Sequence, residues 1–192
     1  MLRRFRPQSG PRRTIFDYGL TALIAIAMAI VVQSFVVKPY VIPSRSMADT
    51  LVPGQRVLVD RMVYRLRSVH RGDIIVFRCA QLADQVLIKR VVGLPGDRLS
   101  LAAGRLFVNG QPSPLAWVRR LDGRLEPTLP GPQQSVPWSL AQPYVVPAGQ
   151  YFAMGDNRTD SDDSRYWGTV SRGQIIGKAF FVYWPVQHVK GL

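Results

Sequence analysis

The chain has 192 residues, 47% of them hydrophobic, which is enough for one domain of ordinary size or for one core with an inserted lobe. Its net charge of +13 includes five arginines within the first thirteen residues, and the other basic residues are scattered instead of forming a basic and aromatic stripe, so nucleic-acid binding is disfavoured. The single cysteine, Cys79, excludes an intrachain disulfide, and because no Cys and His spacing resembles a metal site we expect no metal and no cofactor.

An uncharged apolar stretch of residues 18–37 follows the basic amino terminus. As a helix it would span roughly 30 Å, the thickness of the hydrocarbon core of a bilayer. A cleaved secretory signal peptide is the alternative, but its apolar region would cover about 7–15 residues and end in a small-x-small cleavage site. Residues 35–40 contain no small residue, so we favour an uncleaved anchor.

This pattern predicts three parts along the chain: a cytoplasmic basic tail (1–13), a transmembrane anchor (14–38) and an extracytoplasmic domain (39–192). The orientation follows from the positive-inside rule, because the arginines precede the span. The prediction is a single-pass protein of the cell membrane with its amino terminus in the cytoplasm.

Beyond the span, the pattern indicates strands instead of helices. Short β-branched or aromatic runs, separated by Gly and Pro, cover residues 56–59, 73–77, 86–92 and 179–184. Residues 105–108 followed by Asn109-Gly110 are typical of a strand entering a type I′ hairpin turn. The fold class we predict is mainly β, an antiparallel sheet or barrel with a small inserted β lobe and one amino-terminal transmembrane helix.

Residues 111–149 differ in composition, because they hold eight of the fifteen prolines and few apolar runs. Such a segment is either a loop-rich inserted lobe or a mobile loop, and the sequence leaves both open. We place the inserted lobe at about residues 104–149.

Ser46 is a candidate nucleophile because it lies only nine residues beyond the apolar stretch. A serine hydroxyl needs a nearby base, yet His70 and His188 lie far apart among polar or charged neighbours, so a Ser-His-Asp site is not expected. Lysine can be the base when burial lowers its pKa, by up to about 3–5 units. Lys89 has apolar neighbours on both sides, although spacing alone favours a surface lysine on an edge strand.

A dense polar run over residues 155–168 is the third candidate region. It could be an ordinary solvated loop or, given its aspartates, a calcium loop. Counting from Asp160, Arg165 occupies the position where a calcium loop needs glycine, and counting from Asp156, Arg158 fills the third position. Calcium binding is therefore not expected.

Four segments in order behind the span, residues 42–51, 71–77, 89–97 and 155–168, resemble the bacterial type I signal peptidases. These are membrane-anchored serine endopeptidases that remove signal peptides from exported preproteins after small residues at positions −1 and −3. The resemblance implies a Ser/Lys dyad and three partners: preprotein signal peptides, the lipid bilayer and the secretion translocon. It implies no nucleic acid and no cofactor.

The resemblance also assigns roles to individual residues. It implies that Ser46 is the nucleophile and Lys89 the general base, and that the Ser44 hydroxyl and the Ser46 amide form the oxyanion hole. Roles in support of the dyad and of substrate binding are implied for five more residues: Ser161 orienting the lysine, the charged pair Asp163 and Arg165 behind the site, and the pocket residues Ile42 and Ile88.

The chain departs from the family pattern at Arg45, at Asp49 and at Thr159-Asp160, which flank these residues and bear on substrate preference. Two other functions share some of the features. A self-cleaving repressor-type protein also has a Ser-Lys dyad, but the span and the lack of a DNA-binding amino-terminal domain argue against it. A catalytically inactive, anchored β module that binds signal peptides would lack Ser46 or Lys89, and both are present.

Overall fold

The computed structural model of the chain describes residues 11–31 and 36–192. Its α-helices are α1 (Pro11–Val31), α2 (Val63–Leu66) and α3 (Ser164–Trp167). Its strands are β1 (Val37–Val41), β2 (Arg56–Asp60), β3 (Ile74–Cys79), β4 (Gln85–Gly93), β5 (Arg98–Ala102), β6 (Arg105–Val108), β7 (Gln111–Pro112), β8 (Arg120–Leu121), β9 (Arg124–Leu125), β10 (Tyr144–Val145), β11 (Gln150–Met154), β12 (Val170–Ser171), β13 (Ile175–Trp184) and β14 (Lys190–Gly191). Short 3-10 helices are η2 (Ala80–Leu82), η3 (Leu115–Trp117), η4 (Pro137–Ser139), η5 (Arg172–Gln174) and η6 (Val186–His188).

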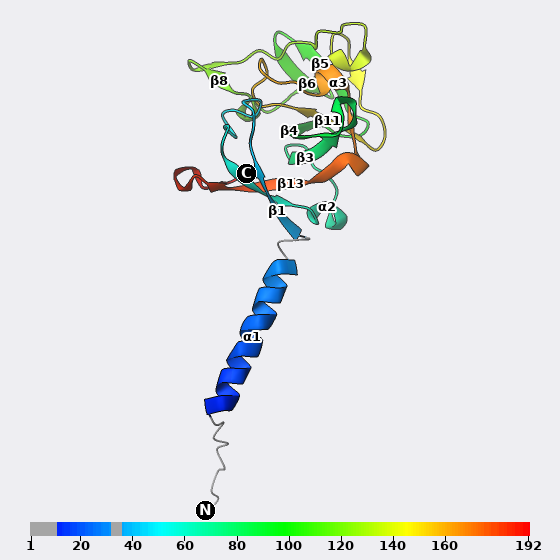
Figure 1. Cartoon of the computed structure of the whole chain (residues 1–192). Coiled ribbons are helices and arrows are strands. Elements are labelled where there is room, and N and C mark those ends of the chain that lie inside the picture. Colours follow the sequence, from blue (N-terminus) through cyan, green and yellow to red (C-terminus); the bar gives the residue numbers. More distant parts are fainter. Residues whose placement is uncertain (1–10, 32–35) are drawn as a thin grey trace, which may run out of the picture.

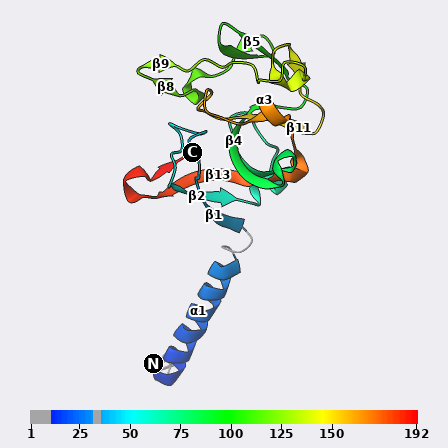
Figure 2. The same ribbon diagram turned by 45° about the horizontal axis from the view of Figure 1, so that its top comes forward.

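Helix α1 lies apart from the β part of the molecule in both views (Figures 1 and 2). Its large apolar side chains from Ile15 to Ile30 are exposed. Over the ranges 11–31 and 36–192, no helix combines the length and apolar character expected of a membrane-crossing segment. The predicted span of residues 18–37 includes residues 32–35, which lie outside the described part of the chain.

The large sheet has eight antiparallel strands in the order β1-β2-β13-β3-β4-β11-β12, with β14 paired to β13. The long strand β13 joins the amino-terminal pair β1-β2 to β3 and carries bulges, so the sheet bends around it (Figure 2). The prediction of a mainly β, antiparallel fold is confirmed. The four predicted strand runs lie in β2, β3, β4 and β13.

Strand β3 shows why one apolar run can be continuous. Ile75 and Phe77 pack on one side of the sheet against Val91 and Trp167, while Ile74 and Val76 pack on the other side. Because both faces of β3 are covered, its sequence is apolar at successive positions instead of alternating. Cys79 at its end is buried in the first of these clusters.

Residues 98–145 contain a smaller four-stranded sheet in the order β10-β5-β6-β7 and the separate ribbon β8-β9. The β6-β7 turn has positive φ at both Asn109 (51°) and Gly110 (79°), which confirms the predicted type I′ geometry. A third apolar cluster joins this region to the large sheet, because Leu99 and Leu140 pack with Phe152 of β11. We call residues 98–145 the lobe.

Candidate active site

Ser46 lies in the loop that connects β1 to β2 (residues 42–55), which we call the nucleophile loop after the role predicted for Ser46. The loop is closed at its base, where the backbone N–H of Ile42 donates to the carbonyl of Gln55 at 2.9 Å. Met47 and Leu51 anchor it by inserting fully buried side chains into the apolar cluster of β2 and β3. This anchoring holds Ser46, itself buried, at a fixed height above the sheet.

Lys89 reaches Ser46 from β4, where it pairs with Ile75 of β3. Its Nζ donates to the Ser46 Oγ at 2.6 Å, and the residue is only 3% exposed. The lysine is therefore not a surface residue on an edge strand, since β4 lies between β3 and β11. Ser46 and Lys89 are brought into direct contact.

Burial lowers the pKa of Lys89, because the charged ammonium has lost most of its hydration. The carboxylates of Asp163 and Asp162 favour the charged form and oppose this shift in pKa without cancelling it. The net direction is downward, which increases the neutral fraction of a lysine that could accept a proton.

Ser44 and the two pocket residues lie beside the Ser46–Lys89 pair. The Ser44 and Ser46 hydroxyl oxygens are 3.2 Å apart. A cavity of about 150 Å³ opens at this place, and Ile42 and Ile88 both line it together with Ser46 and Lys89. The remaining lining residues are Tyr40, Val41, Pro43, Ser44, Val76, Val86 and Leu87. The walls are therefore mainly apolar, with the polar pair at one side; neither His70 nor His188 is among the residues of this lining.

Ser161, Asp163 and Arg165 form a hydrogen-bonded group behind the lysine. Asp163 Oδ2 accepts from the Ser161 hydroxyl at 2.8 Å and from Arg165 Nη2 at 2.9 Å, and Asp163 Oδ1 accepts from Arg165 Nε at 2.9 Å. The Ser161 hydroxyl thus donates to Asp163, whereas the resemblance implies a hydrogen bond to the lysine. No hydrogen bond joins Ser161 to Lys89 within the described residues; the Asp163 carboxylate lies between their roles, because it accepts from Ser161 and raises the pKa of Lys89.

Asp163 remains ionised in a fully buried position. Burial by itself would raise the pKa of Asp163, but the charge and hydrogen bonds of Arg165 hold that pKa below its usual value. Arg165 also donates to the carbonyls of Leu129 and Arg158, at 3.0 and 2.8 Å. Arg165 therefore connects the lobe to the polar run of residues 155–168.

Asn157 and Gly155 of the 155–168 run contact the nucleophile loop, and no role was predicted for either residue. Asn157 donates from its backbone N–H to the Ser46 carbonyl and from Nδ2 to the Arg45 carbonyl, both at 3.1 Å. Gly155 lies so close that an added Cβ would be 2.2 Å from the Ser161 Oγ and 2.4 Å from the Ser46 carbonyl oxygen. The only sequence signal for either residue is its place in a polar run directly after an apolar strand.

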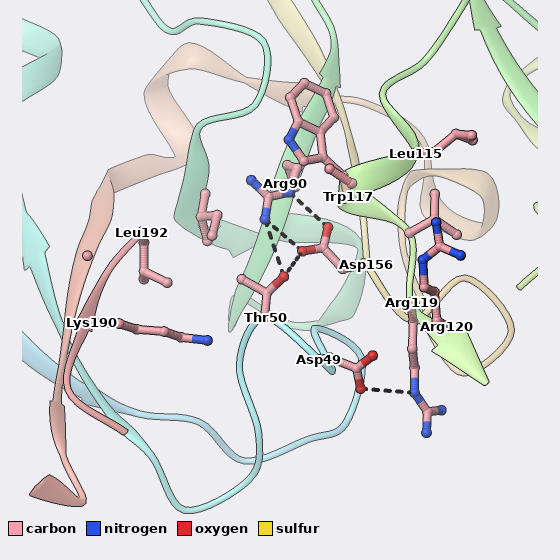
Figure 3. A pocket seen from close by; sticks show the side chains of 14 residues that line it. Asp49, Thr50, Arg90, Leu115, Trp117, Arg119, Arg120, Asp156, Lys190 and Leu192 are labelled. Atoms are coloured by element: carbon pink, nitrogen blue, oxygen red, sulfur yellow. Dashed lines mark hydrogen bonds and ion pairs between the residues drawn. The ribbon is translucent and has the colours of Figure 1, made fainter. Parts of the chain in front are cut away.

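On the other side of the nucleophile loop lies a second cavity, of about 400 Å³ (Figure 3). Arg90 donates to both carboxylate oxygens of Asp156, at 2.9 and 2.7 Å, and its guanidinium lies 5.4 Å from the Trp117 ring centre. Thr50 donates to the same carboxylate at 2.5 Å. This group connects β4 with the end of the nucleophile loop.

Two of the departures from the family pattern, Asp49 and Arg45, are exposed beside these groups. Asp49 forms an ion pair with Arg119 at 3.4 Å, which links the nucleophile loop to the lobe (Figure 3). Arg45 contributes its carbonyl to Asn157. Thr159 donates its backbone N–H to Glu126 at 3.5 Å.

The chain is similar to known proteins over most of its length. The family model described as "Signal peptidase, peptidase S26" matches residues 15–184. The chain is 35% identical over 189 residues to the "Probable signal peptidase I-2" of Synechocystis sp., covering 96% of this chain and 80% of that protein. It is 32% identical over 182 residues to "Signal peptidase IB" of Staphylococcus aureus, covering 93% and 94%. A crystal structure of a signal peptidase I from Enterococcus faecalis is 30% identical, with a TM-score of 0.47, and covers 58% of this chain and 97% of that one.

Proposed function

Since this chain belongs to the signal peptidase family, peptidase S26, we propose that Ser46 and Lys89 form the catalytic dyad with which it removes signal peptides. The observation that carries the proposal is the 2.6 Å contact between Lys89 Nζ and Ser46 Oγ beside an apolar cavity. A nucleophile and its base need this distance.

The proposed reaction starts with the neutral form of Lys89. Its amine accepts the Ser46 proton while Ser46 Oγ attacks the carbonyl carbon of the residue at position −1. The negative charge that develops on the carbonyl oxygen is stabilised by the Ser44 hydroxyl and the Ser46 backbone N–H. The lysine then protonates the departing amine of the mature protein, and a water molecule activated by Lys89 releases the signal peptide from Ser46.

Substrate selection is the second part of the proposal. Ile42 and Ile88 line the cavity beside the dyad, and its small volume suits small apolar side chains at positions −1 and −3. A larger side chain at either position would have to displace a buried wall residue, and closely packed interiors resist such displacement.

Membrane anchoring is the third part. We infer that α1 belongs to a single span, because residues 18–37 carry no charge and follow five arginines. The catalytic domain from residue 39 onward would then lie outside the cytoplasm. Val37 to Ser46 is a short connection, so the dyad stays near the membrane surface, where the cleavage site of a membrane-embedded signal peptide emerges.

The test is a preprotein-processing assay with the purified full chain, Ser46→Ala and Lys89→Ala. Each variant should lose activity by about a thousandfold or more, because each removes a group that acts only as part of the dyad. Melting temperatures measured in parallel show whether the variants are folded. Full activity in either folded variant would exclude the dyad.

A further inference from the structure

A third cavity, of about 530 Å³, is lined by five basic side chains and by no acidic one. We call it the basic cavity; its basic residues are Lys38, Arg61, Arg65, Arg78 and Arg172, and its other lining residues are Tyr40, Met62, Gly173, Gln174, Ile175 and Ile176. The cations come from four separate regions of the chain: β1, the segment of α2, β3 and η5. Folding thus gathers positive charge that is scattered in the sequence, and mutual repulsion makes this arrangement costly without an anion.

Several of these charges are not neutralised by neighbouring carboxylates. Within the described ranges, Arg65 and Arg78 make no ion pair and no side-chain hydrogen bond, and both are exposed. Asp60 does not line the cavity and uses its Oδ1 to accept the backbone N–H groups of Met62 and Val63 at 2.8 and 2.9 Å. The guanidinium groups of Arg65 and Arg78 are therefore available to an external anion.

Two other cations are held in place by aromatic rings. Arg172 donates to the Tyr64 carbonyl at 2.5 Å and lies 5.4 Å from the Tyr64 ring centre. Lys38 lies 5.8 Å from the ring centre of Tyr40. These contacts fix the position of the cations without removing their charge, as expected for a preformed anion site.

The location of the basic cavity identifies the anion. Strand β1 and helix α2 lie at the end of the β part that faces α1 (Figure 1). Lys38 lies in β1, seven residues beyond the end of α1, close to the depth at which lipid phosphates occur if α1 belongs to a span. Leu66, next to Arg65 on α2, is 86% exposed, and an apolar side chain beside basic ones suits the headgroup boundary.

We propose that the basic cavity binds the phosphate headgroup of an anionic membrane lipid. The inference rests on the proposed anchoring of the chain. Tyr40 lines both the basic cavity and the cavity at Ser46, so a bound headgroup would contact the strand that leads into the nucleophile loop. The lipid would in this way fix the height of the dyad above the membrane.

The proposal is tested by native mass spectrometry, which measures lipid bound to the purified full chain in detergent. This readout does not depend on catalysis. The probes are phosphatidylglycerol and phosphatidylcholine with the same acyl chains. Wild-type protein should retain phosphatidylglycerol in preference, and Lys38→Gln/Arg65→Gln/Arg78→Gln should lower that preference about tenfold or more, since each basic residue near an anionic surface contributes to binding. Equal retention of the two lipids by wild type, or an unchanged preference in the triple variant, overturns the proposal.

The matched control removes three exposed arginines from the lobe, at the end away from α1: Arg98→Gln/Arg105→Gln/Arg124→Gln. It should keep the lipid preference. Sodium phosphate at the ionic strength of a chloride control should not displace the lipid; selective displacement would assign the site to free phosphate and overturn the lipid assignment. Ser46→Ala should bind lipid as wild type does, so a failure of the dyad and a failure of the lipid site are distinguishable.

Discussion

The side-chain nitrogen of Lys89 lies 2.6 Å from the hydroxyl oxygen of Ser46, although the two residues are 43 positions apart in the chain. The contact exists because the nucleophile loop is anchored by Met47 and Leu51 on the same sheet that contains β4. A lysine held in this way by packing is already desolvated before substrate arrives. Its protonation state should therefore set the pH dependence of cleavage.

The rate of cleavage should rise with pH through a midpoint well below about 10.4, the ordinary pKa of lysine. Burial lowers the pKa of Lys89, and only the neutral amine can accept the Ser46 proton, so protonation at acid pH removes activity. The measurement is kcat/KM for a signal-sequence peptide between about pH 5 and pH 10, with the full chain in detergent. A midpoint at the ordinary lysine value would contradict the assignment, and Lys190→Gln, an exposed lysine on β14, should leave the midpoint unchanged.

Lys89→Met should be inactive and yet more stable than wild type. Because burial lowers the pKa of Lys89 in the folded state, the folded protein binds fewer protons than the unfolded chain between that value and about 10.4. The lysine therefore destabilises the fold at lower pH, and this cost disappears as pH rises through the window. An apolar side chain of similar length avoids the cost, so we expect a gain of about 1 kcal/mol, a few degrees in Tm.

Thermal unfolding followed by tryptophan fluorescence at several pH values measures this difference. The advantage of Lys89→Met should be largest at acid pH and should shrink toward pH 10. Lys190→Met replaces an exposed lysine and should show no such trend. A variant that is less stable than wild type at every pH would contradict the prediction.

Asp163→Asn should shift the acid limb of the pH profile to lower pH. The Asp163 carboxylate raises the pKa of Lys89, so removing its charge lowers that pKa further. The same change leaves Arg165 buried without its partner, and breaking a buried pair costs about 3–5 kcal/mol, so the variant will also melt at a lower temperature.

A gentler variant keeps this test usable if Asp163→Asn does not fold. Asp162 is exposed and also raises the pKa of Lys89, so Asp162→Asn should move the limb in the same direction with little loss of stability. Asp160→Asn, two residues away and exposed, is the control and should have no effect on the limb. If neither Asp162→Asn nor a folded Asp163→Asn moves the limb, these carboxylates do not act on the lysine.

Much of the fold could be predicted from the sequence because its signals are local. The continuous apolar run in β3 and the Asn109-Gly110 turn each specify their structure within a few residues. Strand β11 was not predicted. Its residues are buried because β11 pairs with β4 and β12 and packs in the cluster around Phe152, and these contacts are made only in the folded chain. Its residues, Gln-Tyr-Phe-Ala-Met, include no β-branched side chain.

The candidate site depends on contacts that sequence spacing does not encode. The spacing of neighbouring residues alone favoured a surface position for Lys89. In the structure Lys89 is buried, because β11 pairs with β4 on one side and the nucleophile loop lies above it. The hydrogen bonds from Asn157 to the nucleophile loop join positions more than a hundred residues apart. The Ser161 hydroxyl points toward Asp163. The same carboxylate oxygen also accepts hydrogen bonds from Gly155 and Arg165, which hold it in place.

Gly155→Ala should reduce activity by about a hundredfold, because a displacement of about 1 Å at a reacting group can cost that much. An added Cβ would lie 2.4 Å from the Ser46 carbonyl oxygen and 2.2 Å from the Ser161 Oγ, so both segments must move apart. The backbone that carries the nucleophile would shift relative to Lys89. Since φ at Gly155 is not in the left-handed region, the effect comes from contact and not from backbone strain.

Peptide cleavage and thermal unfolding, measured together, separate loss of geometry from loss of fold. We expect a decrease in kcat with little change in KM, because the substrate cavity is lined by other residues. Gly191→Ala is the control, since its added Cβ would have no neighbour within 4 Å, and it should keep full activity. Wild-type kcat in a folded Gly155→Ala protein would show that Ser46 and Lys89 tolerate a wider separation than the 2.6 Å contact implies.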